Sequence, residues 1–390
     1  MAEINSTPLP NRAQRRSAAR KVAAAGSAAV LVSVSGSVAG AAPTDVTTCD
    51  DSGAGSLRDA ILYANGHAGP DTITITATCT ASGPVNVASY MEVNDDVTIV
   101  GPGADNFVLD GGDANQIFYV DGNPDFSLSG VTIQHGYITG DGGGINMADA
   151  NDVTISSVVF RDNTAGGSGG ALYVDGAHDV TITNCLFEDN WADSGGALYF
   201  LYEDGLITIS NSTFSSNHAT ASGGGAISVY ENPGDFALFN STITGNTSND
   251  HGPALYLHGL YGDGTILFNT MADNDGSDDG VAVSYQTGST VTFGGNIIAS
   301  PDDGVVLYAV TGATVVTYSN DFFGTTYNVT PDASDLNVDP QLLPLADNGG
   351  QTPTRALADT SPVINQGPSA WTTFTGDGFD QRGTPYVRVY

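Results

Sequence analysis

Short runs in which apolar and polar residues alternate recur along most of the chain. In segments 179–184 and 205–211, β-branched apolar residues alternate with small polar ones. A period of two residues predicts β-strands, whereas a helix needs a period near 3.6. The alternation therefore predicts a chain built of short strands.

The strands belong to a repeat, because one phrase recurs at a nearly constant spacing. Its clearest copies are Phe160-Arg161-Asp162-Asn163, Phe187-Glu188-Asp189-Asn190 and Phe214-Ser215-Ser216-Asn217, and glycine runs end at Ile145, Ala171, Ala197, Ala226, Ala254, Val281 and Val305. Spacings of 24 to 29 residues are typical of a solenoid, in which repeats bury their apolar faces by stacking. At about 3.3 Å per residue, three strands of about five residues fit one repeat, with successive copies parallel and about 4.8 Å apart.

The repeat thus predicts an all-β fold, a parallel β-helix of about nine coils. We expect an export signal at 1–42, an N-terminal cap at 43–84, the β-helix repeats at 85–325 and a C-terminal cap or tail at 326–390.

Asparagines at the coil spacing are expected to form two structural ladders at the bends. Stacked side-chain amides hydrogen-bond along such a column and satisfy backbone groups of the turns. One predicted column is Asn184, Asn211, Asn240 and Asn269, and the other is Asn163, Asn190, Asn217 and Asn246. Phe160, Phe187, Phe214 and Ile243 are expected to stack inside the coil.

The charge is strongly negative and unevenly distributed. The chain carries 43 acidic and 10 basic residues, a formal charge of -33, and five of the cations fall in the first 21 residues. Such a surface repels nucleic acid and anionic lipid, so we expect no nucleic-acid partner. It suits solubility or, alternatively, attraction for Ca²⁺ or cationic partners.

The first 42 residues resemble an export signal. A basic stretch precedes the apolar run Val22–Val32, and Ala39-Gly40-Ala41 fits a small-residue cleavage site. General secretion is favoured over twin-arginine export and over a retained anchor, and no other segment is apolar enough to span a membrane. We therefore expect a secreted or cell-surface protein, and a monomer.

A short cap is expected at the start of the coil. Ser56 is a plausible N-cap, and Leu57, Ala60, Ile61 and Ala64 form an apolar stripe of a short helix that would cover the exposed sheet edge. Cys49 and Cys79 flank this cap, and in an exported protein a disulfide between them would stabilise it by about 3 to 4 kcal/mol. Cys185 is left over as a buried apolar residue.

Two flanking motifs carry a resemblance to known families. Residues 51–61 and 70–75, with the tail motifs at 339–340, 347–354 and 380–383, resemble exported bacterial proteins named for a Cys-Ser-Leu-Arg-Glu-Ala segment, although Gly55 and Asp59 replace its Cys and Glu. The repeats resemble those of polymorphic outer-membrane proteins, which are surface adhesins. The resemblance implies a right-handed parallel β-helix of pectin-lyase type. A closing acidic motif and a transporter barrel, found in such relatives, are missing.

A polysaccharide hydrolase or lyase is the alternative function, because the pectin-lyase-type fold also houses such enzymes. A lyase acting on an acidic polymer needs cations, and the coils offer only Arg161. A hydrolase needs paired carboxylates about 5 to 10 Å apart. The candidate pairs are Asp278 with Asp279, Asp302 with Asp303, and Asp162 with Asp189 on neighbouring coils.

Other candidate ligand sites rest on single features. Asp273, Asp275 and Asp278 resemble the start of a calcium loop, or else form a solvated acidic turn, because position twelve is Ser284 where an EF-hand needs Glu. Tyr173, Tyr199 and Tyr256 follow glycine corners at matching positions and either stack sugar rings or complete the core. No cofactor other than calcium is expected.

The sequence therefore favours a rigid, acidic, exported β-solenoid that binds a polysaccharide or another cell-surface ligand. A purely structural envelope component and a polysaccharide-active enzyme are the alternatives, and the prediction leans against the enzyme.

Overall fold

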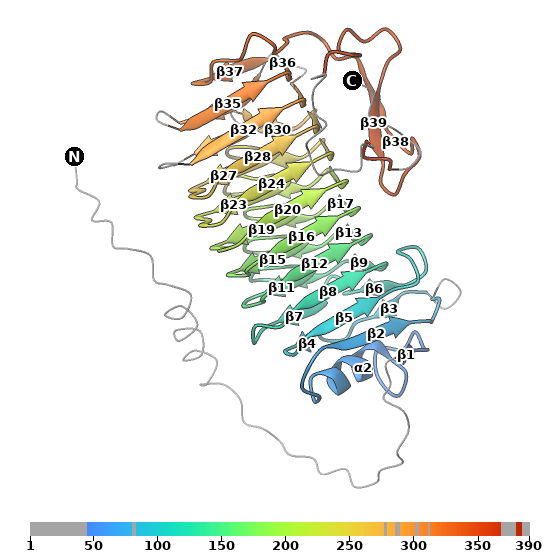
Figure 1. Cartoon of the computed structure of the whole chain (residues 1–390). Helices are drawn as coiled ribbons and strands as arrows, with labels where there is room; N and C mark the ends of the chain where they lie inside the picture. The colour runs from blue at the N-terminus through green and yellow to red at the C-terminus, as the bar shows by residue number, and fades with distance from the viewer. Residues whose placement is uncertain are drawn as a thin grey trace, which may run out of the picture. The chain divides into compact units, whose positions relative to one another are not determined.

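A computed structural model shows a chain wound into a parallel β-helix, in which each turn adds one strand to each of three long sheets and, in the middle coils, to a fourth short one (Figure 1). The structure describes residues 45–79, 83–276, 279–284, 289–300, 304–310, 313–367 and 380–383. Within a coil the chain passes through sheets A, B, D and C in that order. Residues 43–390 form one compact unit.

The strands of these sheets are short, and the neighbours pair in parallel. Sheet A contains β1 (Asp45–Val46), β2 (Asp71–Ile75), β5 (Val97–Val100), β8 (Phe126–Ser129), β12 (Val153–Ser156), β16 (Val180–Thr183), β20 (Ile207–Ser210), β24 (Phe236–Phe239), β28 (Gly264–Leu267), β32 (Thr290–Gly294) and β35 (Thr314–Tyr318). Sheet B contains β3 (Val85–Asn86), β6 (Val108–Asp110), β9 (Thr132–Gln134), β13 (Val159–Arg161), β17 (Leu186–Glu188), β21 (Thr213–Ser215), β25 (Thr242–Thr244), β29 (Thr270–Ala272), β33 (Ile297–Ala299) and β36 (Asp321–Phe323). Sheet C contains β4 (Met91–Val93), β7 (Phe118–Val120), β11 (Ile145–Met147), β15 (Leu172–Asp175), β19 (Leu198–Leu201), β23 (Ile227–Tyr230), β27 (Leu255–His258), β31 (Asp279–Ser284), β34 (Val305–Ala309) and β37 (Thr325–Tyr327). Sheet D contains β10 (Tyr137–Ile138), β14 (Thr164–Ala165), β18 (Trp191–Ala192), β22 (His218–Ala219), β26 (Thr247–Ser248) and β30 (Asp275–Gly276).

The predicted all-β parallel β-helix is confirmed, with about ten turns where the repeat count gave nine. The difference arises at the N-terminal end, because β1 and β2 already pair in parallel inside the segment expected to be a cap. Parallel pairing then continues to β37, which ends at Tyr327.

Stacked apolar side chains fill the interior. Phe160, Phe187 and Phe214 occupy the same position on successive strands and are fully buried. Their ring centroids lie 4.9 and 4.7 Å apart, with planes within 4° of parallel. This spacing is close to the distance of about 4.8 Å between neighbouring strands, so each ring rests on the next.

A helix closes the N-terminal end of the coil, as expected. Helix α2 (Leu57–Ala64) begins after Ser56, whose hydroxyl accepts a hydrogen bond from the Asp59 N–H, and its apolar stripe is buried. Cys49 and Cys79 form the predicted disulfide, with their Cα atoms 5.7 Å apart. None of the described helices is both long and apolar enough to cross a membrane.

The C-terminal segment returns along the outside of sheet B. It contains an antiparallel hairpin of β38 (Leu342–Ala346) and β39 (Thr354–Leu357), which lies beside the coils in Figure 1. The Gln381 amide donates to the Thr213 hydroxyl and the Ser212 carbonyl, and the Thr242 hydroxyl donates to Gln381 Oε1. These contacts cover part of the outer face of sheet B and leave the bend toward sheet D open.

Candidate functional site

An open groove lies at the bend where sheet B passes into sheet D. Its volume is about 520 Å³, and it is lined by Asp113, His135, Asp162, Thr164, Asp189 and Trp191. We call it the corner groove. Three of its side chains are carboxylates, and none of its lining residues is Lys or Arg.

The backbone explains why acidic side chains line up here. His135, Asp162 and Asp189 follow the ends of β9, β13 and β17, and all three have left-handed φ angles, of 47°, 53° and 54°. Asp, Asn and His adopt this conformation more readily than most residues. Since the strands before them pair in register, these three side chains form one column along the axis of the β-helix.

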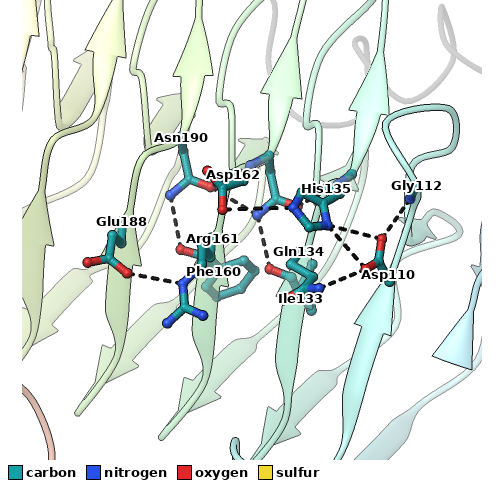
Figure 2. Close-up of polar contacts among 12 residues, drawn as sticks. Asp110, Gly112, Ile133, Gln134, His135, Phe160, Arg161, Asp162, Glu188 and Asn190 are labelled. Carbon is teal, nitrogen blue, oxygen red and sulfur yellow. Dashed lines mark hydrogen bonds and ion pairs between the residues drawn. The ribbon is translucent and has the colours of Figure 1, made fainter. Parts of the chain in front are cut away.

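His135 lies between two carboxylates of this region, as Figure 2 shows. Its Nδ1 lies 3.1 Å from Asp110 Oδ2, and its Nε2 lies 3.9 Å from Asp162 Oδ2. Asp110 also accepts hydrogen bonds from Gln134 Nε2 and the Gly112 N–H. Burial by itself would raise the pKa of Asp110, but the hydrogen bonds from Gln134, Gly112 and His135 and the charge of His135 outweigh it and lower that pKa. Asp110 therefore stays ionised and orients the imidazole.

Asp189 has the opposite electrostatic environment. Burial raises its pKa, and the charges of Glu188 and Asp162 raise it further, with Arg161 opposing them. Arg161 donates from Nε to Glu188 Oε2 at 3.0 Å, so its charge is already matched. Asp189 thus holds a proton more readily than an isolated aspartate.

Trp191 supplies an exposed aromatic surface beside these acids. It opens β18, and 48% of its surface is exposed. Its ring centroid lies 4.1 Å from that of His218, at an angle of 46°. The tilted contact leaves much of the indole facing solvent next to the acidic column.

The predicted tyrosines lie on sheet C and mostly cover one another. Tyr173 and Tyr199 stack with centroids 5.7 Å apart and planes 12° apart, and Tyr199 is only 9% exposed. Ser228 takes the next position in register, before Tyr256, and Tyr230 stacks on Tyr199 instead. Burial, followed by nearby carboxylates such as Asp175, raises the pKa of Tyr173. A sugar ring packs on the face of an aromatic ring, and rings that stack on one another expose mainly their edges. We therefore place the candidate site at Trp191.

One predicted asparagine column runs through the interior behind the groove. Asn163, Asn190, Asn217 and Asn246 are fully buried, and each of the first three donates from Nδ2 to the Oδ1 of the next at 2.9 Å. The column continues to Asn274, whose Oδ1 accepts from Asn246 Nδ2 at 2.9 Å.

The other predicted column needs a correction at its last member. Asn184, Asn211 and Asn240 share a left-handed position at the bend after sheet A, but Phe268 takes that position in the next coil. Asn269 lies one residue further, where the Ser241 N–H donates to its Oδ1. The spacing of 29 residues misled the prediction because this coil is 28 residues long, from Phe239 to its partner Leu267.

The predicted calcium residues do not form a common cluster among the described residues. Asp273 makes an ion pair with Arg355 of the C-terminal segment, Asp275 opens β30, and Asp278 lies outside the described residues. The calcium site therefore stays a prediction. Of the hydrolase pairs, Asp278 and Asp302–Asp303 also lie outside the described side chains, and only Asp162 and Asp189 lie together in a groove.

His135 and Asp113 of the corner groove were missed by the sequence reasoning. The signal was present, since Thr132–Gln134 pairs in register with Val159–Arg161 and the next residues are His135 and Asp162. The copy is so degenerate that only the register shows His135 to belong with Asp162 and Asp189.

Comparison with known proteins bears on the fold of the chain. A search of the curated proteins and a search of the solved structures each find no match to the chain. A family model described as a right handed beta helix region matches residues 95–259 and 143–323, which together span more than half of the chain. The chain therefore belongs to the right-handed β-helix family.

Proposed function

We propose that this protein is an exported β-helix that binds saccharides in the corner groove. The observation that carries the proposal is the half-exposed Trp191 beside a column of carboxylates on a rigid scaffold. A sugar ring can pack its C–H groups on an aromatic face while its hydroxyls donate to carboxylate oxygens. Asp113, Asp162 and Asp189 supply such acceptors along the groove.

The charge of the groove favours neutral or cationic saccharides. Its described lining includes three acids and one histidine, in a chain of net charge -33. An acidic polymer or a nucleic acid would meet repulsion along the whole β-helix. Successive coils also place a polar side chain in the groove about every 4.8 Å, which suits a polymer lying along the axis.

Export and a place at the cell surface belong to the same proposal. The Cys49–Cys79 disulfide is typical of proteins that fold in an oxidising compartment. The basic and apolar pattern of residues 1–42, which lie outside the described part of the chain, supports a secretion signal. The resemblance of the flanking motifs and repeats to exported surface proteins points the same way.

A glycan array on the chain and on its Trp191→Ala variant tests this function, with and without Ca²⁺. We expect binding of neutral or amino-sugar glycans, weakened at least tenfold by Trp191→Ala. Tyr261→Ala is the matched control, since Tyr261 is similarly exposed, at 44%, and lies outside the groove. Absence of glycan binding would leave a structural envelope role. Loss of binding with a chelator would indicate a role for the acidic turns as a calcium site.

Hydrolysis of a bound glycan is a second candidate, favoured by the positions of Asp162 and Asp189 on adjacent coils of the groove. Their backbones lie on adjacent coils, about 4.8 Å apart, and retaining glycosidases hold two carboxyls about 5 to 5.5 Å apart. The raised pKa of Asp189 suits a general acid, with Asp162 as the second carboxyl. A reducing-end assay on any glycan that binds tests this role. Product formation that Asp189→Asn abolishes without loss of binding would support the enzyme over the binding protein.

A further inference from the structure

A second cavity, of about 520 Å³, lies between the β-helix and the C-terminal segment. Its volume is in the range of small-molecule sites, about 300 to 1,000 Å³. It shares no lining residue with the corner groove. We call it the tail cavity.

The two walls of the tail cavity differ in chemistry. The wall on the β-helix is mainly polar and includes Thr242, Thr270 and Ser319. The wall on the C-terminal segment includes the apolar side chains of Leu357, Val363 and Ile364. A ligand that fits both walls needs one polar and one apolar face.

Arg355 adds a partly buried donor to this lining. Its side chain is only 10% exposed, and it lines the cavity. Nε donates to the Leu343 carbonyl, while Nη1 donates to the Thr244 hydroxyl and pairs with Asp273. Nη2 has no hydrogen-bond partner among the described residues. An arginine has five N–H donors, so the two on Nη2 are left without an acceptor among the described residues and are available to a ligand.

Both arginines of the described lining are already paired with carboxylates. Arg355 pairs with Asp273, and Arg382 pairs with Asp380, both through short contacts. The remaining acid, Asp321, accepts a hydrogen bond from the Val338 N–H, and burial raises its pKa to about 6. Among the described lining residues no unpaired cation is left for an anionic ligand, and the Nη2 donors call for an oxygen acceptor rather than an ammonium group.

We propose that the tail cavity is a second binding site, which takes a neutral, hydroxylated ring compound of mono- or disaccharide size. Nη2 of Arg355 donates to a ring or hydroxyl oxygen, and the polar wall contacts the other hydroxyls. The C–H face of the ring packs on Leu357, Val363 and Ile364. This site is independent of the corner groove and holds one short ligand rather than a polymer.

Calorimetric titration of the full chain with a panel of sugars tests the proposal. The neutral probes are glucose, galactose, mannose, N-acetylglucosamine and lactose, and the charged ones are glucosamine and glucuronate. Two variants alter the cavity in different ways. Thr270→Phe fills it, and Arg355→Lys keeps a cation beside Asp273 but removes the Nη2 donors. Thr265→Phe is the matched control, because Thr265 is a half-buried threonine of sheet A outside the cavity.

We expect saturable binding of at least one neutral probe, weakened at least tenfold by both cavity variants. Binding should be unchanged in Thr265→Phe and in Trp191→Ala, which separates this site from the corner groove. The proposal is overturned if no neutral probe binds, if a charged probe binds tenfold more tightly than its neutral counterpart, or if Thr270→Phe binds as well as Thr265→Phe. Loss of binding in Trp191→Ala alone would assign the ligand to the corner groove and also reject the second site.

Discussion

Asp189 and Asn190 are neighbours in the sequence, yet they belong to columns of opposite character. Asn190 is fully buried and makes hydrogen bonds with Asn163, Asn217 and the Phe160 carbonyl. Asp189 is exposed, and the charges of Glu188 and Asp162 repel its own more than that of Arg161 attracts it. Amide side chains that hydrogen-bond from coil to coil therefore stabilise the scaffold. Acidic side chains that repel one another instead leave a surface that can bind a ligand.

The largest effect expected from this contrast is on stability. Asn190→Ala removes four hydrogen bonds and leaves the buried Asn163 N–H without its acceptor, while Asn163 Nδ2 and Asn217 Oδ1 each keep one other partner. At about 1 kcal/mol for each of the other three bonds and about 1 to 3 kcal/mol for the orphaned N–H, the free energy of unfolding should fall by about 4 to 6 kcal/mol. Urea unfolding measures it. Asp189→Ala is the control and should cost less than about 1 kcal/mol, so equal losses in both variants would contradict the contrast.

A smaller effect is expected at Glu203, an acid placed in the interior. Glu203 is fully buried, its Oε2 has no hydrogen-bond partner, and burial followed by the charge of Asp175 raises its pKa well above 4.5. A raised carboxyl pKa stabilises the fold below the unfolded value and loses this contribution as pH rises through the folded one. Stability should therefore decline toward alkaline pH.

Glu203→Gln should remove most of that pH dependence and raise stability at pH 8 by about 1 to 3 kcal/mol. Urea midpoints at pH 5 and pH 8 measure the difference. Glu188→Gln is the matched control, because Glu188 is partly exposed and pairs with Arg161. A pH dependence that persists in Glu203→Gln would place its origin elsewhere.

The smallest effect is expected on saccharide binding at the outer column. The pKa of Asp189 is raised, and the ionised carboxylate is the stronger acceptor for a sugar hydroxyl. Affinity should therefore increase about two- to fivefold as pH rises through that pKa. Titrations at several pH values check this, and Asp189→Asn should flatten the profile. An affinity that falls with rising pH would instead favour protonated Asp189 as a donor.

Most of the β-helix could be predicted from the repeat, because each coil has nearly the same residue pattern as the coil before it. Phe160, Phe187 and Phe214 mark the register, and the same register places the buried asparagines. Where coil length changes, counting fails, as at Asn269. Tyr256 shows the same limit, since Ser228 separates it from Tyr199.

The candidate sites were less accessible to sequence reasoning for two physical reasons. A column is recognised only when its members share a residue type, and His135, Asp162 and Asp189 do not. An aspartate column at the start of sheet A, at Asp96, Asp125, Asp152 and Asp179, was missed as well, although each carboxylate accepts a backbone N–H of the next coil. The tail cavity depends on contacts between residues more than 100 positions apart, which no local pattern encodes.

The return of the C-terminal segment also sets an order of events in folding. The coils pair with partners about one repeat away, so they can form by local steps that spread along the chain. Gln351, Thr352 and Gln381 instead bond to Ser157, Asn211 and Ser212, over separations of 194, 141 and 169 residues. Closing such long loops is slow, and their binding surface exists only after the middle coils have formed. We therefore expect the C-terminal segment to dock late in folding, so that its attachment indicates that the coils beneath it have already formed.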